Sequence, residues 1–112
     1  MNLTKANIKD LRKVTVKIES SNNSEGSGTI VSVEGTLYVL TAAHIIKDET
    51  KDGPLDKGDI VVTLMRNSQK YTLAVDEVVY YNKPEEGDAT VLRVKKLDGM
   101  PTSGFDRVRL LT

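Results

Sequence analysis

The feature that most constrains the fold is an alternation of apolar and polar residues with a period of two. In "VTVKIES", residues 14–20, the apolar Val14, Val16 and Ile18 fall on one face of an extended chain and the intervening polar residues fall on the other. Short β-rich runs recur as "GTIVSV", "TLYVLT", "DIVVTLM", "YTLAVDEVVYY" and "ATVLRV". The pattern predicts an all-β barrel or sandwich of six or seven strands.

Turn-forming residues separate these runs. Glu34-Gly35 is suited to a tight hairpin turn, and residues 66–69 are expected to connect the next pair of strands. Residues 82–87, "NKPEEG", form a third turn-like stretch. A last short strand is expected at residues 108–111.

Helical signals are few. "NLTKANIKDLRK", residues 2–13, has apolar residues at roughly helical spacing and predicts a short N-terminal helix. "AAHII", residues 42–46, predicts a single turn. We therefore expect a helical or extended segment at residues 1–12 and one β-domain at residues 13–112.

Composition and charge exclude several classes of protein. A chain of 112 residues can form one domain with its own core. Sixteen basic residues balance sixteen acidic ones, without the basic surplus of a nucleic-acid-binding protein. No apolar run has the length of a membrane span, the first residues lack the apolar core of a signal peptide, and cysteine is absent. We expect a cytoplasmic protein, unless a leader has been removed, with no nucleic-acid or membrane partner.

Two segments, taken in order, resemble a known family. "GSGTIVSVEGTLYVLTAAHII", residues 26–46, combines a glycine-rich strand, a hairpin and an "LTAAH" motif, and "GDATVLRV" follows at residues 87–94. In this arrangement the chain resembles the N-terminal half of trypsin-like serine peptidases, of the bacterial HtrA-like kind, over roughly residues 13–111. The resemblance implies a six- to seven-stranded antiparallel Greek-key barrel equivalent to the first of that family's two barrels.

The same resemblance assigns two residues of a Ser-His-Asp triad. His44, the only histidine, would be the general base, and Asp88 would be the carboxylate that orients it. The 44 positions between them are close to the spacing of about 45 in the family. The carboxylate fixes one ring nitrogen and leaves the other free to take a proton from a nucleophile. The small Ala42 and Ala43 allow a tight turn, which predicts an imidazole at the barrel rim; the alternative is a structural histidine at a strand end.

The nucleophile of such a triad is missing. The family carries its serine in a Gly-Asp-Ser-Gly-Gly loop on the second barrel, roughly 90 residues after the aspartate. Only 24 residues follow Asp88 here. Ser103 in "TSGFD" lacks both the preceding acidic residue and the second following glycine. We expect residues 97–111 to close the first barrel, and the 112 residues alone to be inactive.

Three interpretations of the missing nucleophile remain open. The chain can be a fragment of a longer endopeptidase, or it can pair with a separate chain; in both cases a C-terminal protease barrel is the partner and a peptide or protein is the substrate. It can also be a non-catalytic barrel, a binding module or pseudoprotease that recognises a peptide or protein. A solitary first barrel would expose its inter-barrel face, so self-association through that face is a further expectation. No cofactor is implied.

Other candidate sites are weaker. Residues 48–59, "DETKDGPLDKGD", have carboxylates at offsets similar to those of an EF-hand loop. The last position is Asp59 rather than glutamate, two lysines dilute the charge and no helices flank the loop, which favours a solvated acidic loop over a calcium site. One histidine without cysteine leaves too few of the usual ligands for zinc. Gly26 and Gly28 are interpreted as bends of a barrel strand.

Overall fold

The computed structural model describes residues 14–66, 68–101 and 105. Its strands and single turns of 3-10 helix are β1 (Thr15–Ser20), β2 (Glu25–Val33), β3 (Thr36–Thr41), η1 (Ala43–Ile46), η2 (Lys57–Asp59), β4 (Ile60–Arg66), β5 (Gln69–Asn82), η3 (Pro84–Glu86) and β6 (Ala89–Val94). Within this part of the chain no helix is long and apolar enough to cross a membrane. The helix expected at residues 2–13, the segment 1–12 and the strand expected at residues 108–111 lie outside the described residues.

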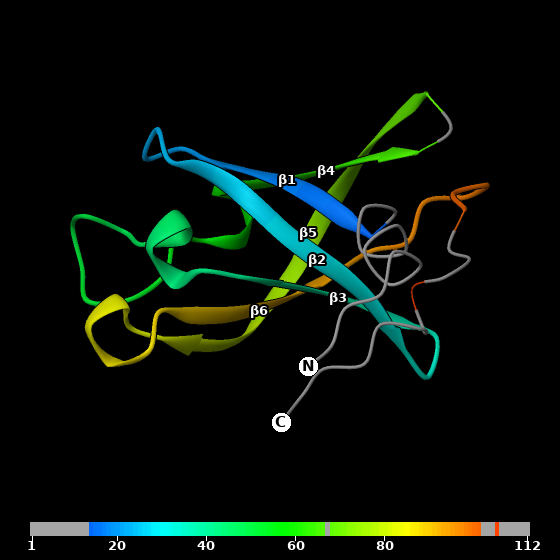
Figure 1. Ribbon diagram of the computed structural model, residues 1–112. Coiled ribbons are helices and arrows are strands. Elements are labelled where there is room, and N and C mark those ends of the chain that lie inside the picture. Colours follow the sequence, from blue (N-terminus) through cyan, green and yellow to red (C-terminus); the bar gives the residue numbers. More distant parts are fainter. Residues whose placement is uncertain (1–13, 67, 102–104, 106–112) are drawn as a thin grey trace, which may run out of the picture.

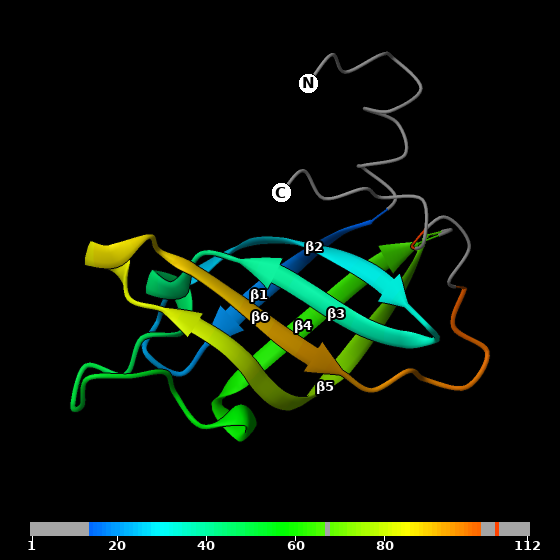
Figure 2. The same ribbon diagram turned by 90° about the horizontal axis from the view of Figure 1, so that it is seen from below.

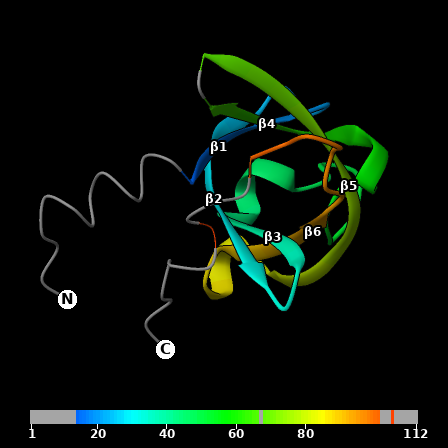
Figure 3. The same ribbon diagram turned by 90° about the vertical axis from the view of Figure 1, so that its right-hand side faces the viewer.

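The six strands form a closed barrel in the order β1-β2-β3-β6-β5-β4, and every neighbouring pair is antiparallel. Figure 1 shows the barrel from the side, and Figure 3 shows the strands arranged around its core. Strands β4, β5 and β6 follow one another as a meander, and β3 lies beside β6, which is a Greek-key arrangement. The prediction of an all-β antiparallel barrel is confirmed.

The core follows the alternation seen in the sequence. On β1, Val16 and Ile18 point inward and are buried, whereas their polar neighbours are exposed. On β6, Leu92 and Val94 are buried in the same way. Phe105 is fully buried and is the largest side chain in the core, so the chain beyond β6 also contributes to the interior of the barrel.

Hairpin boundaries agree with the sequence in one case and correct it in another. Glu34 and Gly35 both have positive φ, the signature of the tight hairpin turn expected there. Arg66 and Gln69, in contrast, pair with each other in the β4–β5 ladder, so they belong to strands and not to the connection. Residues at the end of a hairpin can pair in the ladder while their side chains stay in solvent. Their polar side chains therefore look like those of a loop, although the backbone belongs to the strands.

The two segments identified by motif meet at one end of the barrel. Strand β3 runs antiparallel to β6, and the pairing of Thr41 with Thr90 aligns the end of β3 with the start of β6. Turn η1 follows β3, and the turn that contains η3 precedes β6. These two turns therefore lie side by side, at the left-hand end of the barrel in Figure 1 and again in the view from below in Figure 2.

Candidate functional site: a histidine–aspartate pair at the barrel rim

His44 and Asp88 are in direct contact. The imidazole Nδ1 lies 2.7 Å from Asp88 Oδ2, and the backbone N–H of His44 donates to Asp88 Oδ1 at 2.8 Å. One carboxylate thus holds both the ring and the main chain of the same residue. The His44 side chain is 59% exposed and that of Asp88 is 33% exposed, so the ring lies at the rim and is accessible from outside. The structure brings together the two residues that the sequence analysis singled out.

Turn chemistry explains how Asp88 reaches this position. The backbone N–H groups of Glu86 and Asp88 both donate to the carbonyl of Lys83, at 2.8 and 3.0 Å, and close the turn. Asp88 has a φ of 53° and Gly87 a φ of 155°, backbone conformations that a short polar residue and glycine tolerate best. The φ of Gly87 favours glycine, and a Cβ there would stand 2.3 Å from Asn82 Nδ2, so the Asn82 side chain would have to move.

The protonation of the pair follows from these contacts. The hydrogen bond from the His44 side chain, followed by that from the His44 backbone, lowers the pKa of Asp88 below its ordinary value. The carboxylate is therefore ionised at neutral pH and can only accept hydrogen bonds. The ring proton of a neutral His44 must then be on Nδ1, which leaves Nε2 as the unprotonated, basic nitrogen.

Removing the imidazole should reverse the effect on Asp88. In His44→Ala the backbone N–H remains but the main cause of the depressed pKa is lost, so the pKa of Asp88 should rise towards the ordinary value of about 4. A depressed carboxyl pKa stabilises the fold above the unfolded-state pKa, and this contribution is lost as the pH falls through the folded-state pKa. The stability difference between wild type and variant should therefore shrink below about pH 4.

Carboxyl ¹³C NMR titration measures this change residue by residue. Asp76 is the internal control, because its pKa is lowered by a hydrogen bond from Arg93 and not by His44. An Asp88 titration that is the same in wild type and His44→Ala would show that the contact is not maintained in solution.

The surroundings of the pair are acidic. Burial raises the pKa of Tyr81, and the negative charges of Glu85, Asp52 and Asp88 raise it further. Lys83 is the counter-charge in this region: its Nζ lies 2.5 Å from Asp52 Oδ2, and this hydrogen bond raises the pKa of Lys83. The ion pair connects the turn that carries Asp88 to the loop that follows η1.

Three carboxylates of the acidic loop at residues 48–59 have partners within the protein. Asp48 Oδ1 accepts hydrogen bonds from the backbone N–H and the hydroxyl of Thr50, at 2.8 and 2.6 Å. Asp52 pairs with Lys83 and Asp56 with Lys51. Among the residues that the structure describes, no three His, Asp or Glu side chains come together in a way that could hold a metal ion.

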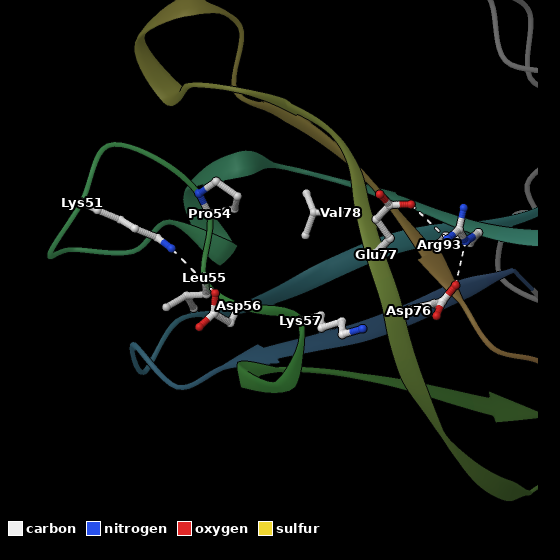
Figure 4. Close-up of a pocket in the computed structure, with 9 residues that line it drawn as sticks. All are labelled: Lys51, Pro54, Leu55, Asp56, Lys57, Asp76, Glu77, Val78 and Arg93. Atoms are coloured by element: carbon white, nitrogen blue, oxygen red, sulfur yellow. Dashed lines mark hydrogen bonds and ion pairs between the residues drawn. The ribbon is translucent and has the colours of Figure 1, made fainter.

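A hollow of about 730 Å³ lies between this loop and the outer side of β5 and β6, and Figure 4 shows its lining. Arg93 pairs with two carboxylates of the lining: its Nε lies 2.8 Å from Asp76 Oδ2, and its Nη2 lies 3.0 Å from Glu77 Oε2. Neither His44 nor Asp88 lines it. It is a wide, open surface depression separate from the histidine–aspartate pair.

Residues that the sequence did not point to support the pair from a distance. Asn22, in the β1–β2 turn, donates its side-chain amide to backbone carbonyls of the η1 segment, and Gly26 lies against Ile45. Asn82 donates to the carbonyl of Glu86 at 3.1 Å. The only sequence signal at Asn22 is the polar run "SSNNS", which predicts a turn and gives no partner 25 residues away.

Comparison with known proteins identified no relative of this chain. No protein-family model matches this chain, and no curated protein matches its sequence. The structure itself is a closed six-stranded antiparallel β-barrel, compatible with a barrel of the chymotrypsin-like kind.

Proposed function

We propose that this barrel is the N-terminal half of a trypsin-like serine endopeptidase and supplies the general base and its orienting carboxylate. The observation that carries the proposal is the double contact of Asp88 with the ring and the backbone of His44, at 2.7 and 2.8 Å. A pair used only for packing does not need an accessible ring whose basic nitrogen is left unprotonated. General-base catalysis needs both properties.

In the proposed mechanism the nucleophilic hydroxyl comes from a second barrel, in the same precursor or in a separate chain. His44 Nε2 takes the proton of that hydroxyl as its oxygen attacks the scissile carbonyl carbon of a peptide substrate. The imidazolium that forms is stabilised by the ionised Asp88, which accepts the Nδ1–H bond throughout. His44 then gives the proton to the leaving amine, and a water molecule repeats the sequence to release the acyl group.

A second candidate function is a binding barrel without catalysis. Among the described residues no serine hydroxyl makes a hydrogen bond to His44, which agrees with a barrel without catalysis and equally with an endopeptidase whose nucleophile lies on a second barrel. In the case of a binding barrel, a peptide or protein partner, or a second copy of the chain, would cover the surface that a second barrel covers in the endopeptidase. The cytoplasmic location expected from the sequence also stays a prediction.

Labelling of the natural product distinguishes the two functions. The product that contains this sequence should be purified from its source, its intact mass measured, and the preparation treated with a fluorophosphonate probe, which modifies activated serines. The endopeptidase proposal expects one labelled serine, in the same polypeptide or in a co-purifying chain, and loss of labelling in His44→Ala. An intact natural product that takes up no label, with any co-purifying chain also unlabelled, would eliminate the serine-peptidase function and leave the binding barrel.

A further inference from the structure

Turn η1, which carries His44, does little to hold itself in place. It is a short 3-10 helix of four residues, Ala43–Ile46, and at its start the N–H of Ile45 donates to the carbonyl of Ala42 at 3.3 Å. No side chain caps its start. A turn this short has no cooperative stability of its own, so its orientation must come from contacts with the rest of the barrel.

One side chain from the β1–β2 turn makes such contacts. Asn22 Nδ2 donates to the carbonyl of Lys47 at 2.7 Å and is 3.4 Å from the carbonyl of Ile45. Its Oδ1 accepts the backbone N–H of Ser24 at 2.8 Å. Because the N–H of Ser24 needs an acceptor, the atom of the Asn22 amide that faces Ser24 must be the oxygen. The amide nitrogen is then the atom that points at η1. Asn22 therefore bridges its own turn and the carbonyls at the end of η1.

A second contact joins the same hairpin to the same turn. Ile45, the residue after His44, is buried against β2 at Gly26, where a Cβ would stand only 2.3 Å from Ile45 Cδ1. The bare backbone at Gly26 thus makes room for the apolar side of η1. The β1–β2 hairpin holds η1 twice, through the Ile45 side chain and through the backbone carbonyls that Asn22 binds.

We propose that Asn22 is a positioning residue for His44, holding η1 in the orientation in which the imidazole and the backbone N–H both reach Asp88. Its importance for catalysis rests on the proposed endopeptidase function, whereas the geometric role can be tested without activity. Asp88 accepts hydrogen bonds from both the ring and the backbone N–H of His44, so a rotation of η1 weakens both of these bonds together. The Asn22 bonds at Ile45 and Lys47 oppose that rotation from the other side of the turn.

The direct test is Asn22→Asp, which keeps the shape and the acceptor for the Ser24 N–H but replaces the donor by a carboxylate that faces carbonyl oxygens. Asn22→Ala removes the donor without adding charge. The readout at neutral pH is the ¹⁵N-resolved proton on Nδ1 of His44, which is strongly downfield when bonded to a carboxylate. In both variants we expect it to move upfield and to exchange faster with water. In Asn22→Ala the pKa of Asp88 should also rise, with Asp76 unchanged.

The matched control is Asn23→Asp, which makes the same charge change one position along the same turn. Asn23 is exposed and has a φ of 66°, which aspartate accepts. Backbone amide spectra establish that each variant keeps the barrel. Folded Asn22→Asp and Asn22→Ala proteins with an unchanged His44 proton would overturn the proposal. An equal change in Asn23→Asp would also overturn it, because charge and not the amide bridge would then be the cause.

In the assembled peptidase, Asn22→Ala should lower kcat by about ten- to a hundredfold, as expected for a misplaced base, with KM changed less than about twofold. The two failures can be told apart. If the natural product has no peptidase activity but the His44 proton still responds to Asn22, the endopeptidase function is wrong and the positioning role stands. If the enzyme is active and kcat and the proton are both insensitive to Asn22, the positioning role is wrong.

Discussion

Asp88→Asn should lower kcat by about 10⁴-fold in the assembled peptidase while KM stays nearly constant. Asparagine has nearly the shape of aspartate, so the turn and the barrel are retained. Its amide oxygen accepts but carries no charge, and its amide nitrogen donates, which favours the ring tautomer with the proton on Nε2. The nitrogen that must accept the proton of the nucleophile is then already protonated, and the developing imidazolium loses its counter-charge.

The control for this prediction is Asp76→Asn. Asp76 is also a partly exposed carboxylate with a depressed pKa, but its partner is Arg93 on the outer side of the barrel. Its kcat should remain within about twofold of wild type, since isolated surface ion pairs contribute little. If Asp88→Asn retains more than about a tenth of the wild-type kcat, the carboxylate does not orient the base, and the mechanism proposed for His44 fails.

Phe105→Ala should destabilise the barrel by about 3–5 kcal/mol, a large part of the total stability of a domain this size. Phe105 is fully buried in the core, and the guanidinium carbon of Arg66 lies 5.2 Å from its ring centroid. Removing the ring leaves a cavity that the strands cannot fill, because their positions are fixed by a closed ladder. Urea denaturation should show a lower midpoint with an unchanged m-value.

Leu97→Ala is the matched control, an apolar truncation in the same stretch after β6. Leu97 is 37% exposed, so its loss should change stability by less than about 1 kcal/mol. If Phe105→Ala were no more destabilising than Leu97→Ala, the chain after β6 would not close the barrel core in solution. The domain would then end near Val94.

Much of the fold could be predicted from local sequence. Alternation placed Val16 and Ile18 on one face of a strand, and both are buried. Glu34-Gly35 predicted its hairpin because two residues with positive φ suit such a turn. Strand ends were predicted less well, as at Arg66 and Gln69, because a ladder pair at a hairpin end is defined by its partner and not by its own composition.

The candidate site, too, could be predicted from the sequence only in part. Family-like motifs named His44 and Asp88 from the sequence, and the structure places their side chains 2.7 Å apart. Asn22 could not have been named, because it acts on residues 23 and 25 positions away through their backbone carbonyls. A backbone carbonyl has no sequence signature, so the side chain that binds it has none either.

By itself the sequence determined which residues of a strand such as β1 point inward and that a hairpin turns at Glu34-Gly35, since both depend on residue type and short-range spacing. His44 and Asp88 were named by the resemblance to a family and not by such spacing. Only the tertiary structure decided that the strands close into the order β1-β2-β3-β6-β5-β4, and that this closure sets η1 between Asp88 on one side and Asn22 on the other. The physical reason is that strand register and closure are properties of pairs of segments: hydrogen-bond ladders join residues far apart along the chain, and neither partner specifies them alone.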